Sequence, residues 1–160
     1  MENNGLAGCL AKLQKGAEYF AGILLMAMVA IVFANVIARF VLNASLAWSE
    51  EIARFLFIWI VFLGSFFAYL TNEHLGLDLV VKAVSPRVAG WINIVADLLA
   101  IITLAVISYG GYSITVDNWD WLSPATSVPY GYVNIIVPLT GVPMLALAVL
   151  RLIRNVRGAL

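Results

Sequence analysis

The sequence has very little charge. Only 11% of its 160 residues are charged, whereas soluble domains usually carry about twice that fraction. Nine basic and nine acidic residues balance to a net charge of zero, so the composition implies no nucleic-acid partner. With 63% of its residues hydrophobic, the chain has the composition of a membrane protein. We therefore expect the lipid bilayer to be one of its partners.

Cysteine and histidine are nearly absent as well. Cys9 is the single cysteine, so the chain cannot close an internal disulfide or form a cysteine-based metal cluster. His74 is the single histidine, so the chain cannot hold a haem between two of its own histidines. The sequence also contains no HExxH, GxSxG or phosphate-loop motif. We therefore expect no catalytic residue, no metal site and no cofactor in this chain.

Four segments without charged residues are long enough to cross a bilayer. They cover 19–38, 55–72, 98–116 and 121–150, and a spanning helix needs about 20 apolar residues. Backbone groups in lipid must bond within their own segment, so the spans must be helices. The sequence thus predicts an all-α integral membrane protein, a single domain over 1–160 with transmembrane helices over roughly 17–42, 53–72, 89–117 and 129–151.

The basic residues predict the orientation. An even number of spans places both termini on one side, which then holds seven of the nine basic residues. Only Arg39 and Arg54 fall on the other side. The positive-inside rule therefore predicts that both termini are cytoplasmic. Between the second and third spans, residues 76–85 place their apolar side chains on one helical face, which predicts a short amphipathic helix in the cytoplasmic interface.

Small residues and prolines predict how the spans pack. The second span carries a small face on which another helix could approach closely, formed by Gly64, Ser65 and Ala68. Gly110 and Gly111 offer the same in the third span. Pro138, Gly141 and Pro143 predict that the fourth span is kinked or locally unwound. Such a break would suit a substrate path, but a kink tolerated inside a bundle is the simpler interpretation.

Asp97 is the only acid well inside a predicted span. An acid at that position is a functional candidate by default. It also lies within reach of the inner interface, where Asn93 or a basic neighbour could satisfy its carboxylate. Both interpretations stay open from the sequence.

Charged residues gather at the two ends of the second span. The outer cluster consists of Arg39, Trp48, Glu50, Glu51 and Arg54, and the inner-turn motif consists of Glu73, His74 and Asp78. Ser49 suits the helix N-cap, and Glu50 is placed to pair with Arg54 four residues later. The outer charges either pair among themselves, Arg39 with Glu51 for example, or contact a partner protein. His74 suits a turn-capping role better than a proton or ligand role.

The segment WSEEIARFLFIWIVFLGSFFAYLTNEHLGLDLV, residues 48–80, resembles the hallmark region of a transporter subunit. The family is that of the small membrane subunits of tripartite ATP-independent periplasmic (TRAP) transporters, the DctQ-like family. Its pattern has a Trp with paired acids, an Arg and an aromatic, a central Gly, and then an acid, a His and an Asp. These are Trp48, Glu50, Glu51, Arg54, Phe55, Gly64, Glu73, His74 and Asp78. Asn35, Arg39 and Phe40 also match, whereas Gly76-Leu77 stands where a basic residue is common.

This resemblance implies a small permease subunit of a sodium-coupled transporter in the bacterial inner membrane. Such a subunit works with a large membrane subunit, which binds substrate and sodium, and with a periplasmic substrate-binding protein. The substrate would be an organic acid of the C4-dicarboxylate or sialic acid type. The small subunit would brace the large one and help dock the binding protein. The alternatives are an autonomous homo-oligomeric channel or exporter, and a membrane anchor subunit of a redox complex.

Overall fold

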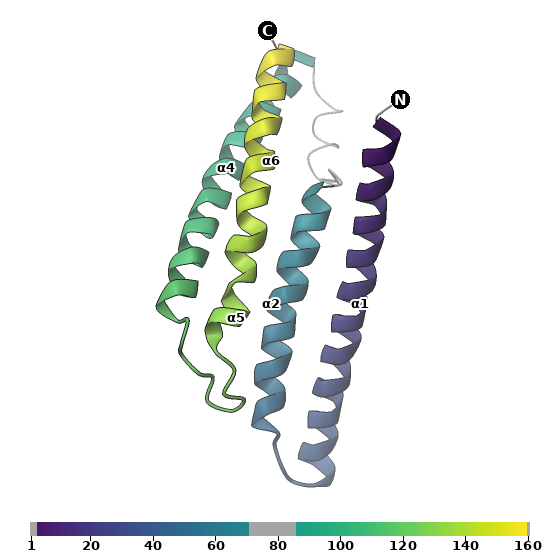
Figure 1. The fold of residues 1–160 in the computed structure, drawn as a ribbon, viewed down its shortest axis with the longest axis vertical. Coiled ribbons are helices and arrows are strands. Elements are labelled where there is room, and N and C mark those ends of the chain that lie inside the picture. The colour runs from purple at the N-terminus through teal and green to yellow at the C-terminus, as the bar shows by residue number, and fades with distance from the viewer. Residues whose placement is uncertain (1–2, 71–85, 160) are drawn as a thin grey trace.

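The structure is a computed structural model that describes residues 3–70 and 86–159 (Figure 1). Its helices are α1 (Asn3–Val41), α2 (Ala47–Leu70), α4 (Pro86–Asp117), α5 (Tyr130–Asn134) and α6 (Ile136–Ala159). Four segments within them are long and apolar enough to cross a membrane, at 14–41, 47–70, 88–117 and 130–157. The predicted all-α fold with four spanning helices is therefore confirmed.

Both termini lie at one end of the molecule, here called the terminal end (Figure 1). The opposite end, here called the link end, holds the connections 42–46 and 118–129. The predicted interfacial helix over 76–85 and the inner-turn motif of Glu73, His74 and Asp78 lie outside the described residues. The helix and the role of the motif therefore stay predictions.

Two helices extend beyond the membrane spans that the charge pattern predicted. The first predicted span, from near residue 17, lies within α1, which starts at Asn3, and the second, from near residue 53, lies within α2, which starts at Ala47. A charged residue marks where a helix leaves the lipid, but it does not end the backbone hydrogen bonding of the helix. Glu50, moreover, lies in the first turn of α2, where an acid is stabilised by the helix dipole.

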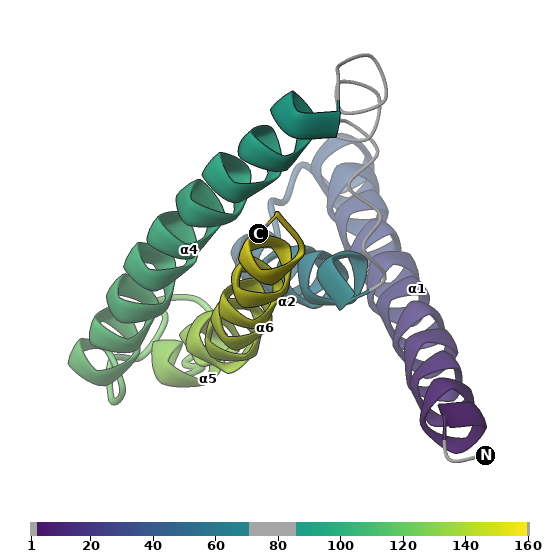
Figure 2. The same cartoon turned by 90° about the horizontal axis from the view of Figure 1, so that it is seen from above.

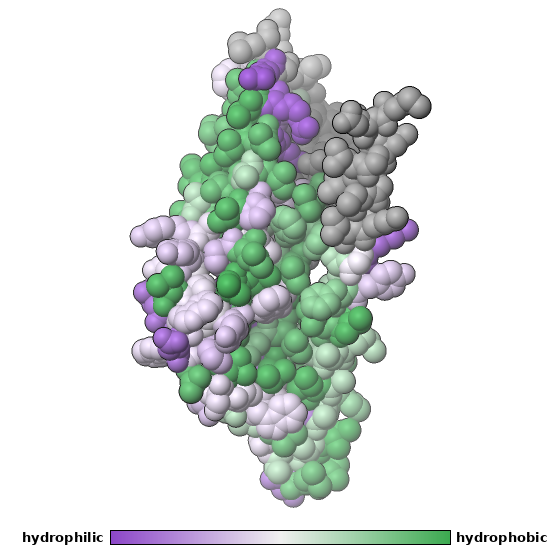
Figure 3. Space-filling model, viewed as in Figure 1, coloured by the Kyte–Doolittle hydropathy of each residue, from purple (hydrophilic) through white to green (hydrophobic). Residues whose placement is uncertain are grey.

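The four spanning helices form a single layer instead of a closed bundle. Among the described residues α1 packs only against α2, α2 packs against α6 and α5, and α6 packs against α4. Figure 2 shows the consequence, with α1 and α4 on the two flanks and α2 and α6 between them. Little of each apolar span is covered by the rest of the chain. Figure 3 accordingly shows apolar residues over much of the face in view.

The closest helix contact joins α4 to α6 through glycines. A side chain at Gly111 would place its Cβ 2.8 Å from the Cβ of Val137, and a side chain at Gly141 would place its Cβ 2.5 Å from the Oγ of Ser108. Because glycine has no side chain, the backbones of α4 and α6 can approach closely at these two positions. Gly64, by contrast, has no other atom within 4 Å of its Cβ position. The predicted small face of Gly64, Ser65 and Ala68 is thus exposed in this chain.

The fourth span is broken, as its prolines predicted. Helix α5 ends at Asn134, and α6 begins after one intervening residue, Ile135. Pro138 has no backbone N–H to donate to the Asn134 carbonyl, so the regular ladder is interrupted there. The N–H of Leu139 donates to the Ile135 carbonyl at 3.1 Å, and the helical hydrogen bonding resumes with this bond. Pro143 lies inside α6 without ending that helix.

The glycine contact can be tested by two neighbouring substitutions. We expect Gly111→Ala to lower the stability of the protein by about 1–3 kcal/mol, because the added methyl group overpacks the contact with Val137. Gly110→Ala is the matched control, since nothing lies within 4 Å of its Cβ position. Both changes gain similar helix propensity. Equal unfolding temperatures of the two variants in mild detergent, followed by tryptophan fluorescence, would contradict the close α4–α6 contact.

Candidate functional site

The link between α1 and α2 is shaped by Asn35 and Asn43. Asn43 has a positive φ of 48°, a conformation that asparagine tolerates better than most residues. The N–H groups of Leu42 and Ala44 both donate to the Ala38 carbonyl, which closes the end of α1. The buried side chain of Asn35 then accepts the N–H of Leu46 at 2.9 Å. This bond fixes the start of α2 against the last turns of α1.

Ser49 does not cap α2 in the predicted way. Because α2 begins at Ala47, Ser49 lies inside its first turn. Its hydroxyl donates to the carbonyl of Leu46 at 2.7 Å, and it is almost completely buried. The hydroxyl therefore closes the turn from within the helix.

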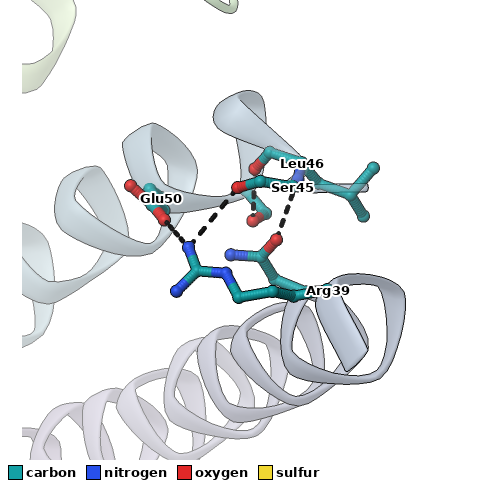
Figure 4. A network of polar contacts seen from close by, with 6 residues as sticks. Arg39, Ser45, Leu46 and Glu50 are labelled. Atoms are coloured by element: carbon teal, nitrogen blue, oxygen red, sulfur yellow. Dashed lines mark hydrogen bonds and ion pairs between the residues drawn. The ribbon is translucent and has the colours of Figure 1, made fainter. Parts of the chain in front are cut away.

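Arg39 and Glu50 form an exposed ion pair across the link (Figure 4). Nη2 of Arg39 lies 3.0 Å from Oε1 of Glu50 and also donates to the Ser45 hydroxyl at 3.4 Å. The two charged side chains are 57% and 55% exposed. The predicted pairing of Glu50 with Arg54 is therefore replaced by a pairing with α1. Arg54 itself is exposed and forms no ion pair with a described residue.

Glu51 is buried, and it binds the other link instead of Arg39. Its Oε1 accepts the N–H of Ala125 at 3.1 Å, while its Oε2 accepts the N–H and the hydroxyl of Thr126, each at 3.0 Å. Only 8% of the residue is exposed. The suggested Arg39–Glu51 pair is wrong, because the carboxylate is occupied by three donors of the 118–129 link. These donors lie 74 or 75 positions away in the sequence, so local spacing could not reveal them.

The 118–129 link is itself held in one shape. Ser123 is 2% exposed, and its hydroxyl shares a hydrogen bond with the Thr126 hydroxyl and accepts the N–H of Val128 at 3.2 Å. The N–H of Tyr130 donates to the Trp121 carbonyl at 2.8 Å, which closes the base of the link.

Several aromatic and charged side chains remain exposed at the link end. Trp48 is 45% exposed and Trp121 is 68% exposed. Together with Arg39, Glu50 and Arg54 they form what we call the link-end surface. The buried Glu51 lies beneath this surface and joins its two connections. The outer cluster predicted from sequence thus contains one buried structural acid among exposed groups.

Asp97 and its neighbours form a second polar cluster near the terminal end. Asp97 is 6% exposed, and its carboxylate accepts the side-chain N–H of Asn155 at 2.6 Å. The partner of this intramembrane acid is therefore an amide from α6, not Asn93. The guanidinium of Arg151 lies 5.5 Å above the ring of Tyr69, so the same region also ties α2 to α6. No group of three potential metal ligands gathers within the described part of the chain.

The Glu51 contact predicts a selective effect on the 118–129 link. We expect Glu51→Ala to speed amide hydrogen exchange at Ala125 and Thr126 about tenfold or more, because a hydrogen bond to a charged group contributes about 1.5–3 kcal/mol. Glu50→Ala is the matched control, since an exposed ion pair contributes about 0–1 kcal/mol. Exchange mass spectrometry checks both variants. Unchanged exchange at Ala125 and Thr126 in Glu51→Ala would show that the carboxylate does not hold the link.

The sequence of this chain is similar to known proteins along most of its length. A family model described as the DctQ component of tripartite ATP-independent periplasmic transporters matches residues 28–158. A protein of Haemophilus influenzae named as a TRAP transporter small permease is 27% identical over 144 residues, covering 90% of this chain and 89% of that protein.

Two further relatives carry a substrate in their names. A C4-dicarboxylate TRAP transporter small permease protein of Vibrio cholerae is 25% identical over 67% of this chain and 43% of its own length. The sialic acid TRAP transporter permease protein of Haemophilus influenzae is 27% identical over 62% of this chain, a match that takes up 16% of that longer protein. The family is one of multi-pass inner-membrane transport proteins and not of enzymes. From its match to the family model over most of its length, this chain belongs to the family of DctQ components, the small permease subunits of tripartite ATP-independent periplasmic transporters.

Proposed function

We propose that this chain braces the large subunit of a sodium-coupled TRAP transporter and helps to dock its periplasmic binding protein. The transported solute would be an organic acid, because relatives are named for C4-dicarboxylate and for sialic acid. Sodium and substrate would bind the large subunit. The occurrence of a similar segment within a longer sialic acid permease supports a close association of the small unit with a large one.

The single-layer arrangement carries this proposal. Four helices in one layer do not enclose a path of their own for a polar solute, since a path requires walls on all sides. The apolar faces of α1 and α4 are exposed within the chain, with large side chains such as Phe33 and Tyr109 at 63% and 78% exposure. A layer of this kind is suited to lie along a larger membrane protein. The small residues of α2, Gly64 among them, offer a place for close approach.

Reconstitution in proteoliposomes tests whether transport requires the large subunit and the binding protein. We expect no uptake of an organic acid by proteoliposomes that hold this chain alone, even with a sodium gradient. Uptake should appear when the large subunit and the binding protein are both added, because the substrate path lies in the large subunit. Saturable uptake by the purified chain alone would contradict the proposal and support the autonomous channel or exporter.

The link end would face the periplasm. Seven of the nine basic residues then lie on the cytoplasmic side, as the positive-inside rule requires. We expect a membrane-impermeant maleimide on intact cells to label Asn43→Cys and Asp120→Cys, but not Arg157→Cys, after replacement of Cys9. All three positions are exposed in the chain. The opposite labelling pattern would reverse the orientation and remove the link-end surface from the binding protein.

The exposed ion pair at the link end tests docking against internal pairing. An exposed pair contributes only about 0.2–1 kcal/mol to stability, whereas a partner protein senses the sign of each charge. We therefore expect Arg39→Glu, Glu50→Arg and the double swap each to lower uptake at limiting binding protein, with the yield of the complex unchanged. Arg157→Glu, at the terminal end, is the control. Restoration of the parent uptake by the double swap would show that the two charges serve only each other.

A further inference from the structure

A notch opens in the side of the layer between α4 and the broken fourth span. It has a volume of about 290 Å³, and its lining consists of Ile107, Gly110, Gly111, Ile114, Asn134 and Val137. The four lining residues of α4 are spaced three, one and three positions apart, which places them on one face of the helix. The two isoleucines lie about one turn to either side of the two glycines, which leave a gap in the row of side chains.

One part of this notch is filled by the chain itself, and the other part is open. Val137 fills the space above Gly111, where an added Cβ would lie 2.8 Å from the Cβ of Val137. Gly110 has nothing within 4 Å of its Cβ position. Ile107 and Ile114 are 39% and 52% exposed. The open part is therefore available to a neighbour of this chain, and α4 lies on one flank of the layer (Figure 2).

Asn134 supplies the one polar side chain among the residues that line the notch. It is half-buried, and its amide forms no hydrogen bond with a described residue. Its backbone carbonyl also lacks the usual helical donor, because Pro138 carries no N–H. The other lining residues are glycine, isoleucine and valine, whose side chains cannot bond to an amide. The amide of Asn134 can therefore both donate to and accept from a neighbour.

The notch lies just inside the hydrocarbon layer of the membrane. The segment 88–117 has 30 residues, or about 45 Å of helix, which matches a bilayer of about 40–45 Å with its headgroups. Gly110 lies seven residues before Asp117, or about 10 Å from the end of this segment. The hydrocarbon core is about 30 Å thick, so a headgroup layer of about 7 Å covers each end of the segment. Water is scarce at the depth of Gly110 and cannot readily satisfy the amide.

The unpaired amide discriminates between the neighbours that could fill the notch. A lipid acyl chain would occupy the volume, but it would leave the amide without a partner in hydrocarbon, which is costly. A protein helix can fill the space above Gly110 and also bring a polar side chain to Asn134. Small residues and interhelical hydrogen bonds are the two features that join helices within membranes. The notch thus fits a transmembrane helix better than it fits lipid.

We propose that the notch receives one transmembrane helix of the large subunit, which presents a polar side chain to the amide of Asn134. A hydroxyl, amide or carboxyl group of that helix would form the hydrogen bond. An apolar side chain next to it would fill the space above Gly110. This inference rests on the proposed function, because bracing of the large subunit requires a defined contact with it.

Site-specific photo-cross-linking in membranes that contain both subunits tests the place of contact. A benzophenone amino acid would replace Ile114 at the rim of the notch, or Tyr109 in the matched control. Tyr109 is 78% exposed, and it lies about 140° around α4 from Ile114. Both positions are therefore accessible, but they lie on different faces of the helix. We expect cross-linking to the large subunit to be about fivefold stronger from Ile114 than from Tyr109.

Binding of the purified chain to the large subunit in detergent tests the hydrogen bond. We expect Asn134→Leu to weaken this binding about threefold, the effect of one average interhelical hydrogen bond in a membrane. Asn118→Leu is the matched control, because the amide of Asn118 already donates to the Ile114 carbonyl. Gly110→Leu, which fills the open part of the notch, should weaken binding about tenfold. Circular dichroism checks that each variant keeps the helix content of the parent.

The parent chain separates failure of this inference from failure of the proposed function. If the parent does not bind the large subunit, both are wrong. With binding by the parent intact, three results would overturn this inference alone. One is equal cross-linking from Ile114 and Tyr109. Another is cross-linking from Ile114 only to lipid or to a second copy of this chain. The third is equal affinity of Asn134→Leu and Asn118→Leu for the large subunit.

Discussion

The buried carboxylate of Glu51 joins the two halves of this molecule. One half is the α1–α2 hairpin and the other is the α4–α6 pair. Among the described helices, α2 alone connects them by packing against the fourth span. A buried charge is costly unless it is fully hydrogen-bonded. Here two backbone N–H groups and one hydroxyl of the 118–129 link meet that requirement. The acid thus fixes the start of α2 and the shape of the opposite link at the same time.

The same arrangement explains the division between exposed and buried polar groups. At the link end, Glu51 is buried and structural, while Arg39 and Glu50 are exposed to whatever approaches. At the terminal end, Asp97 is buried and bonded to Asn155, while Arg154 is exposed. In both places a buried acid joins two separate elements of the chain, and a nearby charged side chain is exposed.

The membrane-spanning helices could be predicted because lipid leaves few choices. A charge-free run of sufficient length must be helical, and Pro138 must interrupt the backbone ladder. The helix starts could not be predicted from charge, because α1 continues through charged residues beyond the lipid. The partners of Glu50 and Glu51 were missed for a different reason. Spacing along one helix favoured Arg54, whereas the tight link brings Arg39 of the previous helix within 3.0 Å of Glu50.

The remaining contacts could not be predicted because they join residues that are far apart in the sequence. Nothing near Asp97 in the sequence points to Asn155, which lies 58 residues away. The sequence of the 118–129 link does not indicate that it hydrogen-bonds to Glu51, although Ser123 and Thr126 carry hydroxyl groups that can donate to a carboxylate. The family resemblance singled out Trp48, Glu50 and Glu51 together. It did not separate the buried acid from its exposed neighbours, which required the three-dimensional arrangement.

We propose that Glu51 keeps the link-end surface in the shape through which this chain would help to dock the binding protein. The most direct measurement is the initial rate of uptake, in proteoliposomes that also contain the large subunit, as a function of binding-protein concentration. We predict that Glu51→Ala raises the concentration needed for half-maximal uptake and leaves the maximal rate and the amount of complex unchanged. A curve that coincides with that of the parent protein would contradict the claim.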